Sequence, residues 1–182
     1  MPPWLNLANL FTTVRLAMVP FIIRAVLAGR NWHALTLFVL AGATDVLDGA
    51  AARRLGQATP GGAYLDPIAD KFLLSGVFVA LAMAGAVPVW YVVLVFGRDL
   101  YILVAALVLM LATPLRRFPP SRWGKASTFF QIATAVAWMT RSAAPAPAVN
   151  AAAIALLWIS AGLTLCSGIH YTWRAAGLAR AH

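Results

Sequence analysis

The sequence contains no glutamate, and its only acidic residues are five aspartates. Charged residues of both signs make up just 10% of the 182-residue chain, whereas hydrophobic residues make up 62%. Soluble domains carry about 25% charged and about 45–50% apolar residues, so this composition excludes an ordinary soluble domain. The single cysteine, Cys166, excludes an intramolecular disulfide and a cysteine-based metal site. We therefore expect an all-α integral membrane protein.

Long apolar segments separated by short breaks predict six transmembrane helices in one bundle. A spanning helix needs about 20 mostly apolar residues, and each break contains glycine, proline or charge, as turns do. The predicted spans are 10–27, 32–51, 63–84, 89–112, 125–140 and 149–171. The stretch before them, PPWLNLANLF, predicts a short interfacial helix at the N-terminus. The length calls for a single domain, residues 1–182.

The basic residues, which give the chain a formal net charge of +9, orient the predicted bundle. Eight of the 14 Lys and Arg residues lie in the connections after the second and fourth spans and in the C-terminal tail, and two, Arg30 and Arg141, lie on the opposite side. The eight are Arg53, Arg54, Arg116, Arg117, Arg122, Lys125, Arg174 and Arg180. The distribution predicts a multi-pass protein of the cell (inner) membrane with both termini in the cytoplasm. Because the charges are dispersed and form no known motif, we expect no nucleic-acid partner.

Four of the five aspartates lie in one short window, TDVLDGAAARRLGQATPGGAYLDPIADK. Asp45 and Asp48 are three residues apart, and Asp66 and Asp70 are four apart, so each pair shares a helix face. Since the intervening loop is short, we expect the second and third helices to be antiparallel neighbours whose carboxylates converge near the cytoplasmic surface. Carboxylates with open water positions suit Mg²⁺ or Mn²⁺. Two such ions can hold the attacking and leaving oxygens of a displacement at phosphorus.

The alternative is a structural ion-pair cluster, in which Arg53 and Arg54 neutralise the first two aspartates. That alternative leaves two glycines unexplained: Gly49 directly follows one aspartate, and Gly62 lies one turn before another. Glycine at a polar pocket lets backbone and ligand approach closely. The glycines therefore favour a ligand site.

The aspartates and glycines together form a pattern that resembles a known family. The run Asp45-x2-Asp48-Gly49-x2-Ala52-Arg53-x8-Gly62-x3-Asp66-x3-Asp70 resembles the signature of the CDP-alcohol phosphatidyltransferases without a gap. The segments NLANLFTTVRLAMVPF, GRDL and WGKASTFFQ resemble further parts of its glycerol-phosphate branch. The resemblance implies a six-helix transmembrane bundle, usually a homodimer. It also implies transfer of a phosphatidyl group from CDP-diacylglycerol to an acceptor hydroxyl, with release of CMP.

The resemblance further implies roles for individual residues. A two-metal site for Mg²⁺ or Mn²⁺ would be formed by Asp45, Asp48, Asp66 and Asp70. Asp70 would also be the general base that removes the proton of the acceptor hydroxyl, which requires hydrogen-bond reach directly or through one water. The nucleotide and donor site would be formed by Asp45, Asp48, Gly49, Ala52, Arg53 and Gly62.

Cations near membrane depth are candidates for binding a phosphate on the acceptor, because arginine offers a bidentate fork for such groups. The candidates are Arg15, Arg98, Arg122 and Lys125. For Arg98 the alternative is charge balance with Asp99 or Asp70. For Lys71 we expect a snorkelling or charge-balancing role.

These cations favour a phosphorylated acceptor. Glycerol 3-phosphate, giving phosphatidylglycerophosphate, is the leading hypothesis. Phosphatidylglycerol, giving cardiolipin, is the alternative, because the pair Arg98-Asp99 looks closer to eukaryotic-type cardiolipin synthases, whereas phosphatidylglycerophosphate synthases more often carry Arg-Glu. Inositol phosphate is a third candidate.

Proteins of other classes could also place aspartates in a membrane. A divalent-cation transporter is the main non-enzyme rival, since intramembrane aspartates often mark ion paths. The four aspartates, however, gather near one predicted membrane face, and no second polar cluster continues outward. A membrane prenyltransferase would place two aspartate clusters far apart in a longer chain.

Overall fold

The computed structural model describes residues 7–55, 62–112 and 122–179, and the side chains at 12–44, 69–105 and 122–173. Six helices account for nearly all of these ranges, and no strand occurs in them. They are α1 (Leu7–Leu27), α2 (Asn31–Leu55), α3 (Gly62–Met83), α4 (Val89–Ala112), α5 (Arg122–Ala143) and α6 (Pro147–Ala179). The predicted all-α class and the six predicted helical segments are confirmed. The largest difference is in α6, which continues to Ala179 rather than ending near Tyr171.

The predicted interfacial helix is not a separate element in the described part of the chain. From Leu7 onward its residues form the first turns of α1 and continue without a break into the predicted first span. The rest of that stretch, residues 1–6, lies outside the described residues.

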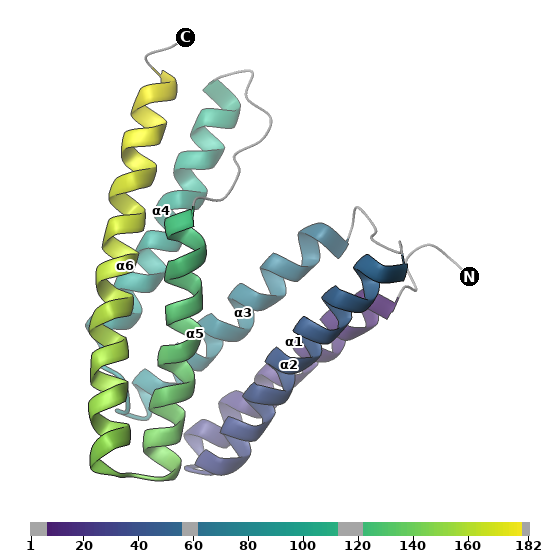
Figure 1. Ribbon diagram of the computed structural model, residues 1–182, viewed down its shortest axis with the longest axis vertical. Helices are drawn as coiled ribbons and strands as arrows, with labels where there is room; N and C mark the ends of the chain where they lie inside the picture. The colour runs from purple at the N-terminus through teal and green to yellow at the C-terminus, as the bar shows by residue number, and fades with distance from the viewer. Residues whose placement is uncertain (1–6, 56–61, 113–121, 180–182) are drawn as a thin grey trace.

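Successive helices run in opposite directions, because the connections 28–30, 84–88 and 144–146 all lie at one end of the molecule (Figure 1). Two of these connections turn at a glycine with positive φ, 69° at Gly29 and 68° at Gly85. In each turn the glycine N–H bonds to the carbonyl three residues earlier, and the next N–H bonds to the carbonyl five residues before it. This pattern satisfies carbonyls at the end of the helix and requires a residue that tolerates a left-handed backbone.

The helices form a ring in the order α1, α2, α5, α6, α4 and α3, closed by contacts of α3 with both α4 and α1. Figure 1 shows α1, α2 and α3 inclined against the group formed by α4, α5 and α6. Over the described residues no direct packing joins α2 to α3, because α1 lies between them. The prediction that these two helices are direct neighbours is therefore wrong for this part of the chain.

A glycine explains why α1 packs so closely on α3. A Cβ built on Gly76 of α3 would lie 3.1 Å from Ile23 Cδ1 and 3.2 Å from Val19 Cγ1, both on α1. The absence of a side chain at this position lets the two backbones approach. Ile22 of α1 and Val77 of α3, both fully buried, belong to the same apolar core.

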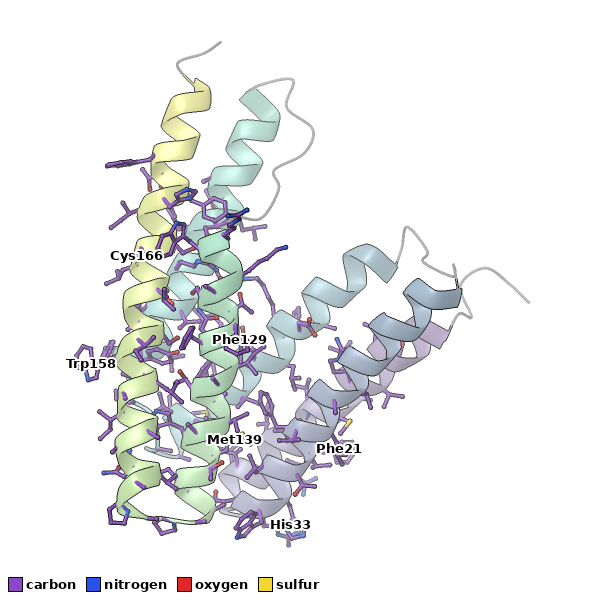
Figure 2. The ribbon with its side chains drawn as sticks, in the orientation of Figure 1. Phe21, His33, Phe129, Met139, Trp158 and Cys166 are labelled. Carbon is purple, nitrogen blue, oxygen red and sulfur yellow. The ribbon has the colours of Figure 1, made fainter. Side chains whose placement is uncertain are left out.

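Large apolar side chains are exposed on the outside of the ring. Phe21 is 65% exposed and Trp158 is 63% exposed, and Figure 2 shows the Trp158 ring pointing away from α6. Within the described ranges one segment, Pro147–Trp173, is long and apolar enough to cross a membrane, with a mean hydropathy of 1.9.

Candidate active site

A cavity of about 520 Å³ lies inside the ring, with walls from α1, α2, α3, α4 and α5. Most of the wall is apolar and is formed by residues such as Phe38, Leu74 and Val136. Its polar and charged members are Arg15, Asp70, Lys71, Ser75, Asp99, Thr128 and Gln131. Although α2 and α3 do not pack against each other here, both contribute to this one wall. A molecule with an apolar and a charged part matches such a cavity.

Asp70 on α3 and Arg15 on α1 form an ion pair at the cavity. The Arg15 Nη1 atom donates to Asp70 Oδ1 at 2.5 Å. The Arg15 side chain is 1% exposed, whereas that of Asp70 is 48% exposed. A buried guanidinium needs an anionic or hydrogen-bonding partner, and Asp70 supplies one while its carboxylate stays accessible from the cavity. The structure thus places Arg15 on the predicted base, and phosphate binding by Arg15 stays a prediction.

Asp99 and Arg98 of α4 together link this helix to α3 and α6. The Asp99 Oδ2 atom lies 2.5 Å from Lys71 Nζ on α3, and its Oδ1 accepts a hydrogen bond from Arg98 Nη1 at 2.8 Å. The other terminal nitrogen of Arg98, Nη2, donates to Ser167 Oγ on α6 at 2.5 Å. Arg98 and Lys71 thus both form ion pairs with Asp99, and phosphate binding by Arg98 stays a prediction.

A buried polar seam connects α5 and α6 behind the cavity. Gln131 Nε2 donates to Ser127 Oγ at 3.3 Å and to Thr164 Oγ1 at 3.2 Å, and the two hydroxyls lie 3.1 Å apart. Tyr91 of α4 joins this seam through a 2.8 Å bond between its hydroxyl and that of Ser160. Sequence reasoning did not select Gln131 as a site residue. The signal that could have identified it is a polar amide side chain within the apolar run FFQIATAV.

The remaining predicted site residues lie on α2, α3 and α5. Asp45, Asp48, Gly49, Ala52 and Arg53 lie in α2, and Gly62 and Asp66 lie in α3, but their side chains are outside those that the structure describes. Arg122 and Lys125 are exposed in the first turn of α5 and do not line the cavity. Among the described side chains no three His, Cys, Asp or Glu residues form a group that could hold a metal ion. The roles predicted for these residues stay predictions.

Comparison with known proteins gives the chain its relatives. The model of the CDP-alcohol phosphatidyltransferase family matches residues 5–166. A probable phosphatidylglycerophosphate synthase of Mycobacterium tuberculosis is 36% identical over 177 residues, covering 93% of this chain and 81% of the relative. The CDP-diacylglycerol–glycerol-3-phosphate 3-phosphatidyltransferase of Bacillus subtilis is 30% identical over 181 residues, covering 91% of this chain and 93% of the relative. A putative cardiolipin synthase of Mycobacterium bovis is 33% identical over 126 residues, covering 69% of this chain and 60% of the relative.

Proposed function

Because the chain belongs to the CDP-alcohol phosphatidyltransferase family, we propose that it transfers the phosphatidyl group of CDP-diacylglycerol to glycerol 3-phosphate. The products are phosphatidylglycerophosphate and CMP. In this reaction the acceptor hydroxyl oxygen forms a bond to the phosphatidyl phosphorus, the bond from that phosphorus to CMP breaks, and the hydroxyl proton passes to a base.

The coverage of the relatives favours glycerol 3-phosphate as the acceptor. The two relatives named for phosphatidylglycerophosphate synthesis align with 91–93% of this chain, whereas the relative named as a cardiolipin synthase aligns with 69%. Phosphatidylglycerol remains the second candidate acceptor, because Arg98 is followed by Asp99 rather than by glutamate.

The observation that carries the proposal is the half-exposed Asp70 carboxylate on the wall of a cavity that α2 also lines. Asp66 lies one helical turn before Asp70 on α3. On α2, position 45 follows Gly42, a cavity residue, by three residues, and residues three apart share a helix face. The helical register therefore supports a site to which both helices contribute, although α1 separates them elsewhere.

The donor set fits a hard divalent cation, because it consists of carboxylate oxygens alone. The residues that would hold Mg²⁺ or Mn²⁺ are Asp45, Asp48, Asp66 and Asp70. When bound, such ions offset the negative charge on the phosphorus oxygens and on the departing CMP.

Asp70 is the residue to which we assign the proton of the acceptor hydroxyl. Its carboxylate lines the cavity, and the buried guanidinium of Arg15 fixes one of its oxygens. A base must lie within hydrogen-bond reach of the proton that it removes. The apolar wall of the same cavity excludes water from the reaction, and the Gly49, Ala52, Arg53 and Gly62 positions would take the nucleotide.

We also propose that all six helices span the inner membrane as one domain, with both termini in the cytoplasm. The large apolar side chains exposed around the ring support this, because soluble proteins rarely expose extended apolar surface. The excess of basic residues in the connections after the second and fourth helices supports the orientation. The family resemblance supports a homodimer.

The test supplies purified protein with CDP-diacylglycerol and Mg²⁺ or Mn²⁺ and measures CMP. Glycerol 3-phosphate, phosphatidylglycerol and inositol phosphate are offered in separate reactions. We expect CMP release that depends on the metal and on glycerol 3-phosphate. Release with phosphatidylglycerol instead would identify a cardiolipin synthase. No release with any acceptor, together with metal uptake by proteoliposomes, would contradict the proposal and favour a transporter.

A further inference from the structure

One carboxylate at the cavity is held between two cations that come from different helices. Asp99 contacts Lys71 of α3 through one oxygen and Arg98 of its own helix through the other. Lys71 and Asp99 line the same cavity as Asp70. Lys71, Arg98 and Asp99, hereafter the α3–α4 triad, therefore place two groups on the wall of the cavity that Asp70 lines, and Arg98 contacts one of them, Asp99.

The triad attracts anions even with its own carboxylate in place. Two cations and one carboxylate sum to a net charge of +1. The Arg98 side chain is 9% exposed, and its Nε has no hydrogen-bond partner among the described residues. A buried donor without a partner is costly, and a group that brings acceptor oxygens would relieve that cost. Lys71, by contrast, is 56% exposed and lines the cavity.

We propose that Lys71 and Arg98 bind the phosphate of the acceptor and that Asp99 is the internal anion with which this phosphate competes. The inference rests on the proposed transferase function and adds a specificity-determining residue to it. In the free protein Asp99 occupies both cations. When the acceptor binds, its phosphate oxygens take over contacts that Asp99 makes in the structure.

This arrangement makes Asp99 a selector. Its negative charge stays beside the site and repels every anion that enters, so charge alone binds weakly. An acceptor whose glycerol hydroxyls make further contacts near Asp70 offsets that repulsion, whereas inorganic phosphate does not. Asp99 therefore lowers the affinity for phosphate as such and favours the complete acceptor.

The experiment measures KM for glycerol 3-phosphate, kcat, and competitive inhibition by inorganic phosphate, at saturating CDP-diacylglycerol. Asp99→Asn should lower the phosphate inhibition constant by about fivefold and KM for glycerol 3-phosphate by a smaller factor, because the competing charge is gone and selection against phosphate alone is lost. Lys71→Met should raise both by a similar factor. Asp99→Glu retains the charge and should lower the phosphate inhibition constant less than Asp99→Asn does. Arg141→Met removes a cation in the last turn of α5 that does not line the cavity, and it serves as the control.

The outcomes separate the possibilities. If Asp99→Asn raises KM as Lys71→Met does, Asp99 orients the cations rather than competing with the phosphate, and the proposal is overturned. If Lys71→Met leaves KM and phosphate inhibition unchanged, the triad does not bind the acceptor, whether or not the Asp99 variant folds. Should phosphatidylglycerol prove to be the acceptor, the same shifts are expected in its KM.

CMP release by the parent protein tests the proposed transferase function independently of the triad. If the parent protein releases no CMP with any acceptor, the transferase assignment fails. Titration calorimetry with inorganic phosphate alone still tests the triad in that case. Tighter phosphate binding by Asp99→Asn supports the competition, and unchanged binding contradicts it.

Discussion

At the scale of single residues, the ion pair of Arg15 and Asp70 unites a fully buried cation with an accessible carboxylate. A charged hydrogen bond restricts the orientation of the carboxylate. Arg15 thereby holds Asp70 toward the cavity from the neighbouring helix. We infer that Arg15 is a positioning residue for the base.

Removing the Arg15 charge tests this role. Arg15→Met fills much of the same volume but removes the hydrogen bond from Arg15 to Asp70. We expect turnover to fall about 10-fold or more, since small misplacements of reacting groups reduce rates strongly. CMP release is the measurement. Arg24→Met, at an exposed position of the same helix, is the matched control and should turn over like the parent, while equal losses in both variants would contradict the role.

Removing the Asp70 charge tests the base itself. Asp70→Asn keeps the size of the side chain and an oxygen that can accept from Arg15. General bases contribute about 10²–10⁴-fold to rates, so we expect turnover to fall by that range. Metal-dependent binding of CDP-diacylglycerol should change little, because Asp45, Asp48 and Asp66 are retained. Turnover at the parent rate would show that another group takes the proton.

At the scale of helices, the position of α1 between α2 and α3 depends on the close approach at Gly76. Ile23 and Val19 occupy the space that a side chain would need. Because α3 carries Asp66, Asp70 and Lys71, the packing of α1 on α3 also sets how far these residues lie from α2.

Gly76→Leu should separate α1 from α3. Overpacking a close contact costs about 1–3 kcal/mol, so we expect a lower thermal midpoint in detergent. Gly162→Leu introduces the same side chain on α6, where nothing lies within 4 Å of a built Cβ. That variant should unfold at the parent temperature. If both variants unfold alike, the close approach at Gly76 is not what fixes α1.

The sequence was sufficient to predict the helices, because each apolar run ends at glycine, proline or charge, and these signals are local. It could not place α1 between α2 and α3, since the chain order suggested that a short loop joins direct neighbours. It also could not select Asp99 as the partner of Lys71, which is 28 residues earlier in the chain. Such pairings depend on how the ring closes. The aspartate pairs, in contrast, could be predicted from the sequence, because a spacing of three or four residues places both members of a pair on one helix face.

At the scale of the whole molecule, five of the six helices line one cavity, and large apolar side chains such as that of Trp158 point outward (Figure 2). The connections 28–30, 84–88 and 144–146 lie together at one end. In the proposed orientation this end faces away from the cytoplasm. The aspartate window begins toward the opposite end of α2.

This orientation can be tested with the single native cysteine. Cys166→Ser gives a background without cysteine, into which Ala28→Cys, Ala84→Cys or Ala144→Cys is introduced. A thiol reagent that does not cross membranes should label all three in intact cells stripped of any outer membrane. Labelling of all three only after lysis would show that the orientation is the reverse of the one proposed. A mixture of the two results would contradict six spanning helices.

The central claim is that aspartates of α2 and α3 hold the same metal ions. Electron paramagnetic resonance of the protein with Mn²⁺ and CDP-diacylglycerol tests it directly. We expect the spectrum of two spin-coupled Mn²⁺ ions, lost in both Asp45→Asn and Asp66→Asn, which remove one carboxylate from each helix. Asp99→Asn, which lies outside the set, should retain the coupling. A coupled pair that survives the loss of Asp66, or a spectrum of isolated ions in the parent protein, would contradict the account.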